Sequence, residues 1–358
     1  MARLTRAQQQ ERTRAAVLVA ARREFAEHGY AEAKVDRIAE HAELTRGAVY
    51  SNFTGKRELY LAVLADIAER SWAAAQPPAR SPDSAGRALA AFARVWLERL
   101  PFAGSGRLRL RSLTGVLDTD PARAALAELV RFEALLLASA LDPRTRPVRL
   151  AELTLTLLHG AAGLAENAPG AGDPFDLVRA AEHLAGIGFP ADTEPPHLPF
   201  VAPARPARDT WTPPGGLRDE ITGRRIDVDD DGVVVVLGVR RLSAAEEAMR
   251  SVRPGDALTF VVVTDDPTGT GRLARLRLVD LLACLRRVFA PEDLPRPRLV
   301  FDDLGTVPAA IGRDTPDDAT EAAVRVRDGL IVARAEGRGA GHAVADGGDR
   351  EHDGVRPV

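Results

Sequence analysis

The sequence predicts two folded units in one chain, an all-α unit followed by an α/β unit. Apolar residues recur at helical spacing from near the N-terminus to about residue 190. Eight prolines then fall between residues 190 and 214, a density that favours an extended, semi-rigid spacer. Beyond them, short valine-rich runs bounded by turn residues alternate with helical stretches, as in a sheet covered by helices. With 358 residues, the chain is long enough for two or three domains.

The composition is that of an ordinary folded protein. Apolar residues make up 45% of the chain and charged residues 28%, which is typical of globular domains. The longest apolar run near the N-terminus, residues 15–21, is too short to cross a bilayer, so we expect no membrane partner and a cytoplasmic location. The single cysteine, Cys284, excludes an internal disulfide and a metal site built from several thiolates.

The first 60 residues predict three helices in a helix-turn-helix arrangement. In residues 9–28 an apolar stripe that includes Phe25 is followed by Gly29, a residue suited to end a helix. Two short helices, at 35–42 and 46–53, follow with three residues between them. In a helix-turn-helix the second helix enters the DNA major groove and the first helix braces it.

The charge distribution agrees with a polyanionic partner for this end of the chain. Residues 1–60 hold eleven basic and eight acidic residues, a net charge of +3, whereas the whole chain has a net charge of −3. A basic end on an acidic body favours contact with nucleic acid. We therefore expect double-stranded DNA as a partner and a place in the nucleoid.

The second short helix carries side chains suited to contact DNA. Thr45 precedes this helix and can cap it by accepting from a backbone N–H near Ala48, a contact worth about 1 kcal/mol. Arg46 can reach a guanine edge or a phosphate. Lys56 begins the next helix, where an ammonium beside a helix N-terminus can clamp a phosphate. The predicted DNA-binding residues are Thr45, Arg46, Gly47, Tyr50, Ser51 and Lys56.

Four linked segments in this region carry a family resemblance. They are AARREFAEHGY (20–30), VDRIAEHA (35–42), LTRGAVYSNF (44–53) and KRELYLAVL (56–64). Together they resemble the DNA-binding domain of the TetR family of bacterial transcriptional regulators. The resemblance covers roughly residues 1–190 and implies a homodimer, a recognition helix at 46–52 and phosphate contacts from Tyr50 and Lys56. It also implies an effector pocket in the helical body, for a small molecule that the sequence does not identify.

Two positions depart from the family pattern. Glu43 stands in the turn where the family usually has glycine, and a non-glycine residue in the left-handed region costs about 1 kcal/mol. Ala33 stands where a capping threonine or serine is usual, so we expect a weak cap on the 35–42 helix. Both departures lower the expected DNA affinity without removing the fold.

The pattern stays helical from residue 56 to about residue 190. We expect the last two helices, at about 148–166 and 174–186, to pair two subunits. The residues that could line an effector pocket are Trp72, Phe92, Trp96, Phe132 and His159. Ordinary core packing explains the aromatic residues equally well, and for His159 packing is the simpler interpretation.

The C-terminal half carries a second resemblance, through the order of its segments. ITGRRIDVDDDGVVVVLG, a helix, ALTFVVVTDD, a second helix, PRLVFDDLGTVPAAIG and VRVRDGLIVARAEG follow one another within residues 217–337. This order resembles a thioredoxin-fold domain of the peroxiredoxin type. Such an enzyme needs a cysteine at the start of the helix after the first core strand, and residues 239–248, VRRLSAAEEA, contain none. Cys284 falls on an apolar face of the 273–290 helix, so we expect a buried cysteine and a module without catalysis.

No cofactor or metal is expected. The seven histidines show neither HExxH spacing nor pairing with cysteine. The acidic run at 229–231 is better explained as a hairpin turn than as a calcium loop, because spaced ligands and a distal glutamate are absent.

These observations predict a DNA-binding transcriptional regulator, not an enzyme. We expect a ligand-responsive homodimeric repressor that binds a near-palindromic operator. Two alternatives stay open: a thioredoxin-fold redox protein tethered through its N-terminal helical domain, and a regulator controlled by a protein partner at its C-terminal module. The expected segments are a helix-turn-helix domain (1–60), an effector-binding and dimerisation domain (61–189), a proline-rich linker (190–216), a thioredoxin-like domain (217–340) and a flexible tail (341–358).

Overall fold

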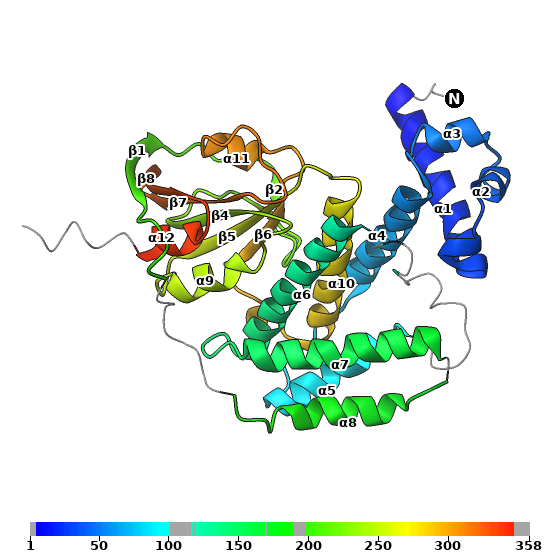
Figure 1. The fold of residues 1–358 in the computed structure, drawn as a ribbon, viewed down its shortest axis with the longest axis horizontal. Coiled ribbons are helices and arrows are strands. Elements are labelled where there is room, and N and C mark those ends of the chain that lie inside the picture. Colours follow the sequence, from blue (N-terminus) through cyan, green and yellow to red (C-terminus); the bar gives the residue numbers. More distant parts are fainter. Residues whose placement is uncertain are drawn as a thin grey trace, which may run out of the picture.

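The N-terminal part of the molecule is all-α. The computed structural model describes residues 5–100, 113, 116, 119–168, 170–189 and 198–346. The helices described before residue 190 are α1 (Arg6–Glu32), α2 (Val35–His41), α3 (Arg46–Tyr50), α4 (Lys56–Ala74), α5 (Ala85–Leu97), α6 (Asp120–Leu141), α7 (Val148–Asn167) and α8 (Pro174–Leu184). Helices α1 to α3 form a small lobe, and α4 runs from this lobe into a body made with α5 to α8 (Figure 1).

The small lobe is closed by apolar residues from all three of its helices. Phe25, Ile38, Val49 and Phe53 are each at most 1% exposed. The ring of Phe25 also meets Tyr60 of α4 edge-on, with centroids 4.8 Å apart. The predicted helical spacing at the N-terminus is therefore confirmed, and α4 shares the core of this lobe.

A mixed sheet forms the centre of the C-terminal part. Its six strands lie in the order β1–β8–β7–β4–β5–β6. They are β1 (Arg205–Thr210), β4 (Gly232–Gly238), β5 (Ala257–Val263), β6 (Arg298–Phe301), β7 (Glu321–Arg327) and β8 (Leu330–Glu336). β4 runs parallel to β5 and antiparallel to β7, and β5 runs parallel to β6. A separate ribbon pairs β2 (Leu217–Arg218) with β3 (Arg225–Ile226). The multidomain prediction, with an α/β C-terminal part, is confirmed at this level.

The hairpin predicted around Asp328 and Gly329 is also present. Arg327 pairs with Leu330 across a two-residue turn, and both turn residues have positive φ, 51° and 72°. Two successive positive φ values are the signature of a type I′ turn, whose twist suits a hairpin.

Helices cover the sheet and connect its parallel strands. They are α9 (Ala244–Ser251), α10 (Thr270–Val288), the 3₁₀ helix η1 (Pro291–Asp293), α11 (Thr306–Ala310) and α12 (Ala340–Asp346). α10 is buried around most of its circumference, because it packs against the helices α4, α5 and α6 of the body and its Arg275 lies over the Phe301 ring of β6 (Figure 1).

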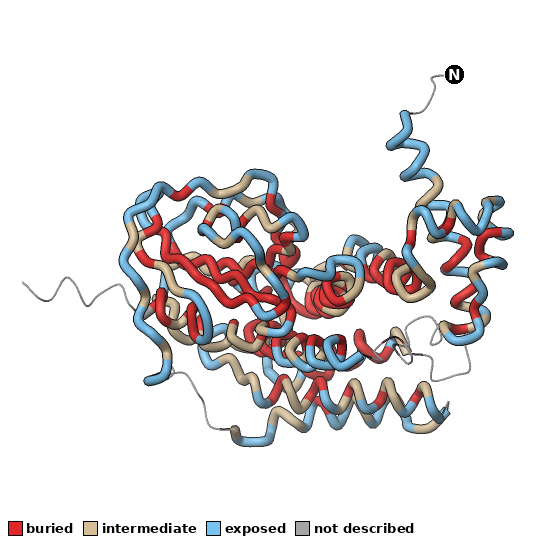
Figure 2. The backbone as a smooth tube through the Cα atoms, turned by 45° about the horizontal axis from the view of Figure 1, so that its top comes forward, coloured by how far each residue is buried: buried red, intermediate tan, exposed pale blue. Residues whose placement is uncertain are grey.

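The two parts of the chain therefore share one core. A single cluster of buried apolar residues extends from Val17 in α1 to Ala345 in α12 (buried residues are red in Figure 2). A second cluster, which includes Trp211 and Val261, fills the space on the other side of the sheet. The proline-rich segment separates the two parts along the sequence, but α10 joins them in space.

Two segments expected to be irregular contain regular structure. β1 lies inside the expected 190–216 linker, where it pairs with β8 at the edge of the sheet; Pro206 is tolerated there because an edge strand has one free side. α12 continues past the expected end of the domain at residue 340, with Val344 fully buried. The rest of the expected tail, residues 347–358, lies outside the described residues, as do residues 190–197 of the linker. No helix among the described residues is long and apolar enough to cross a membrane.

Candidate nucleic-acid interface

The turn between α2 and α3 has the backbone conformation expected from the sequence. Glu43 has a φ of 55°, in the left-handed region. Its N–H donates to the carbonyl of Glu40 at 3.0 Å, and the N–H of Leu44 donates to Ala39 at 2.9 Å. These bonds close the end of α2 and reverse the chain into α3, although the side chain at position 43 is not one that favours this conformation.

Thr45 caps α3 as predicted. Its hydroxyl accepts from the backbone N–H of Ala48 at 3.2 Å. The helix is shorter than predicted, ending at Tyr50, and a further turn in which Asn52 and Phe53 both donate to the carbonyl of Val49 completes the segment. Because Val49 and Phe53 face inward, the opposite side of α3 is left to solvent.

The exposed side of α3 presents Arg46 and Tyr50. The guanidinium of Arg46 lies 5.4 Å from the centre of the Tyr50 ring and 3.2 Å from a carboxylate oxygen of Asp36 on α2. Both members of this ion pair are more than 60% exposed, so the pair holds Arg46 only weakly. A Cβ added at Gly47 would meet nothing closer than 3.8 Å, and the Ser51 hydroxyl donates to the carbonyl of Ala48. The surface around Gly47 therefore leaves room for the backbone of a DNA strand to approach closely.

Lys56 has a different environment from the one expected. Its ammonium donates to the carbonyls of Ala31 and Ala33, at 3.0 and 3.3 Å, and lies 5.0 Å from the centre of the Tyr30 ring. It therefore closes the C-terminal end of α1 as well as beginning α4, and two of its three N–H donors bond to backbone carbonyls.

Glu24 provides the cap that Ala33 cannot. The helix α2 has no side-chain cap from its own N-cap residue, Lys34. Instead a carboxylate oxygen of Glu24 accepts from the N–H of Lys34 at 2.9 Å and from the Arg37 guanidinium at 2.8 Å. Burial alone would raise the pKa of Glu24, but these hydrogen bonds outweigh it and the pKa lies below its ordinary value. In the sequence, the only sign of this capping role is that Glu24 is an acidic residue on the buried stripe of α1.

The five residues predicted to line one pocket lie in three places. Trp96 lies between Phe92 and His159, with ring centres 6.0 and 5.2 Å away. Phe132 meets Phe260 of β5 edge-on at 5.8 Å, so it packs against the sheet. Trp72 is not part of either group.

Trp72 lies against the α/β part of the chain. The guanidinium groups of Arg218 and Arg286 are 5.1 and 4.5 Å from the centre of its ring. A Cβ added at Gly223 would come within 2.1 Å of the ring, so only glycine fits there. Trp72 is therefore an interdomain contact.

A buried ionic cluster occupies the middle of the body. Arg277 of α10 makes two hydrogen bonds to the Glu133 carboxylate of α6, at 2.8 and 2.6 Å. It also donates to Nε2 of His159 at 2.7 Å, so this ring nitrogen accepts and the imidazole is neutral. Burial, followed by the charges of Arg277 and Arg99, lowers the pKa of His159 to about 3. Burial also raises the pKa of Glu133, against the effect of Arg277.

The same cluster includes an ion pair between Arg99 of α5 and Asp280 of α10. A cavity of about 60 Å³ remains beside it, lined by Leu64, Leu276, Arg277 and other residues of α4 and α10. This is room for a few water molecules. Residues of α4 and α10 therefore form most of the walls of this small cavity.

Hydrogen bonds also connect α10 to the small lobe. The guanidinium of Arg272 donates to a carboxylate oxygen of Glu58, in the first turn of α4, at 3.2 Å. The other carboxylate oxygen of Glu58 accepts from the N–H and the hydroxyl of Thr54, at 2.7 and 2.8 Å. Thr54 lies just after the segment that follows α3, so three residues connect the sheet-covering helix to the candidate interface.

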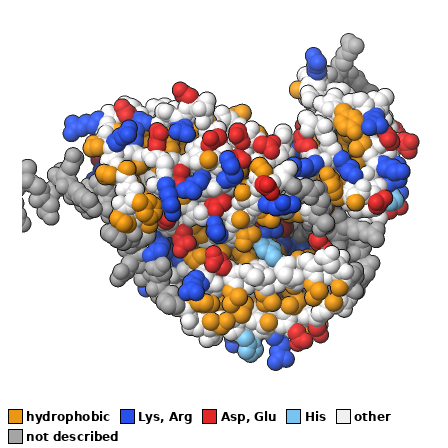
Figure 3. Space-filling view, in the orientation of Figure 1, with side chains coloured by type: hydrophobic (Ala, Val, Ile, Leu, Met, Phe, Trp, Pro, Cys, Tyr) orange, Lys and Arg blue, Asp and Glu red, His pale blue; other side chains and the backbone are white. Residues whose placement is uncertain are grey.

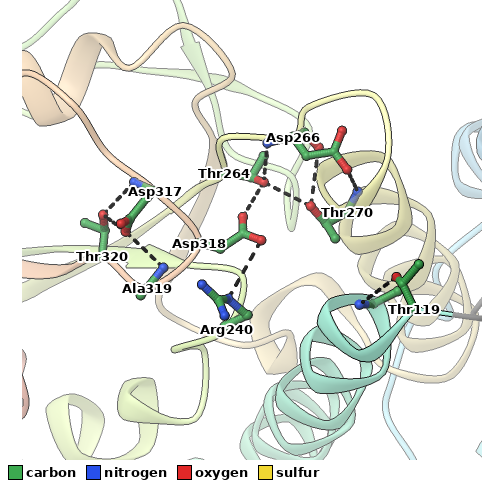
Figure 4. A network of polar contacts seen from close by, with 10 residues as sticks. Thr119, Arg240, Thr264, Asp266, Thr270, Asp317, Asp318, Ala319 and Thr320 are labelled. Atoms are coloured by element: carbon green, nitrogen blue, oxygen red, sulfur yellow. Dashed lines mark hydrogen bonds and ion pairs between the residues drawn. The ribbon is translucent and has the colours of Figure 1, made fainter. Parts of the chain in front are cut away.

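Polar residues meet where the parallel strands β4 and β5 end (Figure 4). The Thr264 hydroxyl donates to Asp318 at 2.5 Å, and Arg240 lies 3.9 Å from the same carboxylate. Asp266 accepts from the N–H groups of Gly269 and Thr270, which caps α10. Burial raises the pKa of Asp318.

No cysteine lies at this edge of the sheet among the described residues. Cys284 lies in α10, 2% exposed, as predicted for a packed cysteine. The described residues also contain no group of three or more histidine, cysteine, aspartate or glutamate residues able to hold a metal ion.

The geometry of α1 to α4 defines a class of protein, the helix-turn-helix DNA-binding proteins. Residues 17–63 match the family model of bacterial regulatory proteins of the tetR family. This segment of the chain is a TetR-family DNA-binding domain.

Named relatives match in the same region. The chain is 48% identical over 65 residues to the HTH-type transcriptional regulator SrpR of Pseudomonas putida, which is 18% of this chain and 30% of SrpR. It is 44% identical over 54 residues to the HTH-type transcriptional repressor AcnR of Corynebacterium diphtheriae, or 15% of this chain and 28% of AcnR. The matches therefore span less than a third of either relative.

Solved structures of two regulators also match part of the chain. The putative transcriptional regulator SCO4942 from Streptomyces coelicolor is 29% identical, over 48% of this chain and 97% of SCO4942, with a TM-score of 0.31. NalD, the secondary repressor of the MexAB-OprM multidrug efflux pump in Pseudomonas aeruginosa, is 25% identical over 50% of this chain and 94% of NalD, with a TM-score of 0.32.

Proposed function

We propose that this protein is a transcriptional repressor that binds DNA as a homodimer and responds to a small-molecule effector. The observation that carries the proposal is the solvent-facing side of α3, which presents Arg46 and Tyr50 from a helix capped by Thr45. A helix of this kind reads base edges with its first residues, while neighbouring groups bind phosphates. The match of residues 17–63 to the tetR family model supports the same use of this surface.

The exposed faces of α7 and α8 support the homodimer. Leu164 is 48% exposed on α7 and Phe175 is 79% exposed on α8. A Cβ added at Gly160 or Gly163 would meet nothing within 4 Å, so the α7 face is uncovered. Hydrophobic side chains gather on this part of the surface (Figure 3). Pairing two copies there by a two-fold axis would place the recognition helices about 34 Å apart or a multiple of this distance, on a near-palindromic operator.

The experiment for DNA recognition compares two substitutions on specific and random duplexes. Arg46→Ala should relax the sequence preference, because Arg46 is assigned to a base edge. Lys56→Ala should weaken binding to every duplex and flatten the plot of log affinity against log salt by about 0.9. Arg70→Ala, an exposed α4 residue paired with Asp66, is the control and should change neither quantity.

Two results would contradict these assignments. Equal effects of both substitutions on specific and random DNA would contradict the assignment of Arg46 to a base and of Lys56 to a phosphate. No preference of the unaltered dimer for any duplex, after selection from random sequences, would remove the regulator function itself. Thermal unfolding of each variant must be measured alongside, because Lys56 also closes the end of α1.

For the α/β part, we infer a thioredoxin-like module that supports the regulator without catalysis. Its element order, with α9 after β4 and the β7–β8 hairpin near the end, agrees with the resemblance. The redox alternative requires a working thiol, and the only cysteine is the buried Cys284. Peroxide turnover by the full chain that disappears in Cys284→Ser would favour the redox protein. We expect no turnover in either protein.

A further inference from the structure

A cavity of about 390 Å³ opens between the helical body and the α/β part of the chain. The loop between α6 and α7 forms one wall, and the segments that lead into β5 and β6 form the other (Figure 1). This volume falls in the range of about 300–1,000 Å³ that small-molecule sites occupy. The cavity is much larger than the space of about 60 Å³ left beside Arg277.

Positive charge dominates the lining. The charged residues around the cavity are Arg146, Arg253, Arg296, Arg298 and Asp256. Asp256, the one carboxylate, is already neutralised at 2.5 Å by the buried Arg325. Arg298 is paired with Asp230, which is not part of the lining. With four arginines and one aspartate, the lining has a formal excess of positive charge.

Arg146 is held at this cavity by a backbone carbonyl. Its guanidinium donates to the carbonyl of Met249 at 2.7 Å. Its backbone has a φ of 42°, a conformation that arginine rarely adopts. Burial and then Arg250 lower the pKa of Arg146, while Glu246 acts in the opposite direction. Strained residues and partly buried charges of this kind are frequent at ligand sites.

Apolar groups complete the lining and limit the ligand further. They are contributed by Pro143, Met249, Val252, Pro254, Leu258 and Pro297. Inorganic ions would leave these groups in contact with water, whereas an organic ligand would cover them. The cavity therefore favours a ligand with a charged end and an apolar body.

We propose that the cavity between the two parts binds a small organic anion, with a carboxylate or phosphate group among the arginines and an apolar body against Met249 and Leu258. Residues from both parts of the chain line the site, so a bound anion would stabilise their contact. In its role as an effector site the proposal rests on the repressor function proposed above, and it places the effector away from the aromatic residues of the body. The binding site itself does not depend on DNA.

Isothermal titration calorimetry on the full chain tests the site with defined probes. Phenyl phosphate and phenylacetate represent the two anionic groups, and phenylacetamide and inorganic phosphate lack one feature each. At least one organic anion should bind with a dissociation constant below about 1 mM, and both control compounds should bind at least about tenfold more weakly. Arg146→Gln and Arg296→Gln should each weaken the organic anion about tenfold. Arg205→Gln, an exposed arginine of β1, is the matched control and should leave binding unchanged.

Several results would overturn the proposal. These are no binding of either organic anion at millimolar concentration, equal binding of phenylacetamide or inorganic phosphate, and undiminished binding in both arginine variants. If Arg146→Gln unfolds the α6–α7 loop, the exposed Arg296 decides alone. The titration contains no DNA, so failure of the repressor function would leave its result intact. The effector role is then measured by adding the bound anion to the DNA titration; unchanged DNA affinity would refute that role only.

Discussion

Single residues fix the geometry of the recognition segment, and one of them does so under strain. Glu43 adopts a φ of 55° because its neighbours close the turn with backbone hydrogen bonds, not because its side chain favours this conformation. Glycine at this position would keep the turn and remove the steric conflict between Cβ and the backbone. The strain is local, so its removal should act on stability without moving α3.

Glu43→Gly should raise the free energy of unfolding by about 1 kcal/mol, measured by denaturant titration. Glu43→Ala is the control, because it removes the same negative charge but keeps the Cβ. The alanine variant should not show the stabilisation. If both variants are stabilised equally, charge and not backbone conformation governs this position.

His159 should make stability depend on pH. Its pKa in the folded protein is about 3, whereas an exposed histidine titrates near 6.5. Below pH 6.5 the unfolded chain takes up a proton that the folded chain does not, so the free energy of unfolding should fall from pH 6.5 towards pH 3. The slope due to this residue is at most about 1.4 kcal/mol per pH unit.

The contribution of His159 is isolated by difference, because burial also shifts the pKa of the neighbouring Glu133. His159→Gln should flatten the fall between pH 6.5 and pH 4, while His183→Gln, on the exposed side of α8, should not. Parallel curves for His159→Gln and the unaltered protein would mean that the folded state accepts the proton.

Among the elements, α10 has the greatest influence on the arrangement of the others. It follows β5 in the chain and covers the sheet, yet its polar side chains pair with residues of α4, α5 and α6. The pair of Arg277 and Glu133 is the most buried of these contacts, with side chains 16% and 1% exposed. Breaking such a pair on one side is costly because the other charge stays buried without compensation.

Arg277→Met should therefore lower the free energy of unfolding by about 3–5 kcal/mol. The double variant with Glu133→Gln should recover much of this loss, since the uncompensated charge is gone. Arg287→Met, on the same helix, tests the substitution itself: Arg287 pairs with Glu98 at the surface, and the change should cost less than about 1 kcal/mol. Equal losses for the two single variants would show that the burial of the Arg277 pair has no energetic importance.

At the scale of the whole molecule, the shared core makes each part depend on the other. A chain ending at residue 189 would lack α10, and the buried faces of α4 and α5 would meet water. We expect this fragment to lose cooperative thermal unfolding and to bind a hydrophobic dye. A cooperative transition at the temperature of the full chain would contradict this expectation.

A cleaved full chain is the matched control for the deletion. A protease site introduced between residues 190 and 197 would break one peptide bond and leave the packing in place. The two fragments should elute together in size-exclusion chromatography and unfold in one transition. Separate elution would show that the contacts of α10 do not hold the parts together.

The sequence was sufficient wherever the structural signal is local. The helix-turn-helix, the Thr45 cap, the conformation of Glu43 and the hairpin at Asp328 all depend on residues within a few positions of each other. The sequence also predicts a helix with an apolar face at 273–290, but not the neighbours of that helix. Its partners Glu133 and Glu58 are 144 and 214 positions away, and no periodicity reports a contact at that separation.

The expected site was predictable only in part, for the same reason. Arg46 and Tyr50 lie on the exposed side of α3, as helical spacing predicts. The second role of Lys56 depends on the end of α1, which its own helix does not reveal. The residues predicted to line one pocket share aromatic character but not location, because Phe132 packs against Phe260 of the sheet and away from the others.

The position of α10 also bears on how hybrid sensors could be made from this chain. The proline-rich stretch looks like the place to join this N-terminal part to the C-terminal part of another protein. A fusion there would replace α10, which pairs with Arg99, Glu133 and Glu58, by a foreign helix. Such a chimera would keep the helix-turn-helix, but the helices of its body would have no matching partner on the face that α10 covers. Successful chimeras should keep the segment from Thr270 to Val288 together with the helices α4, α5 and α6 that it contacts.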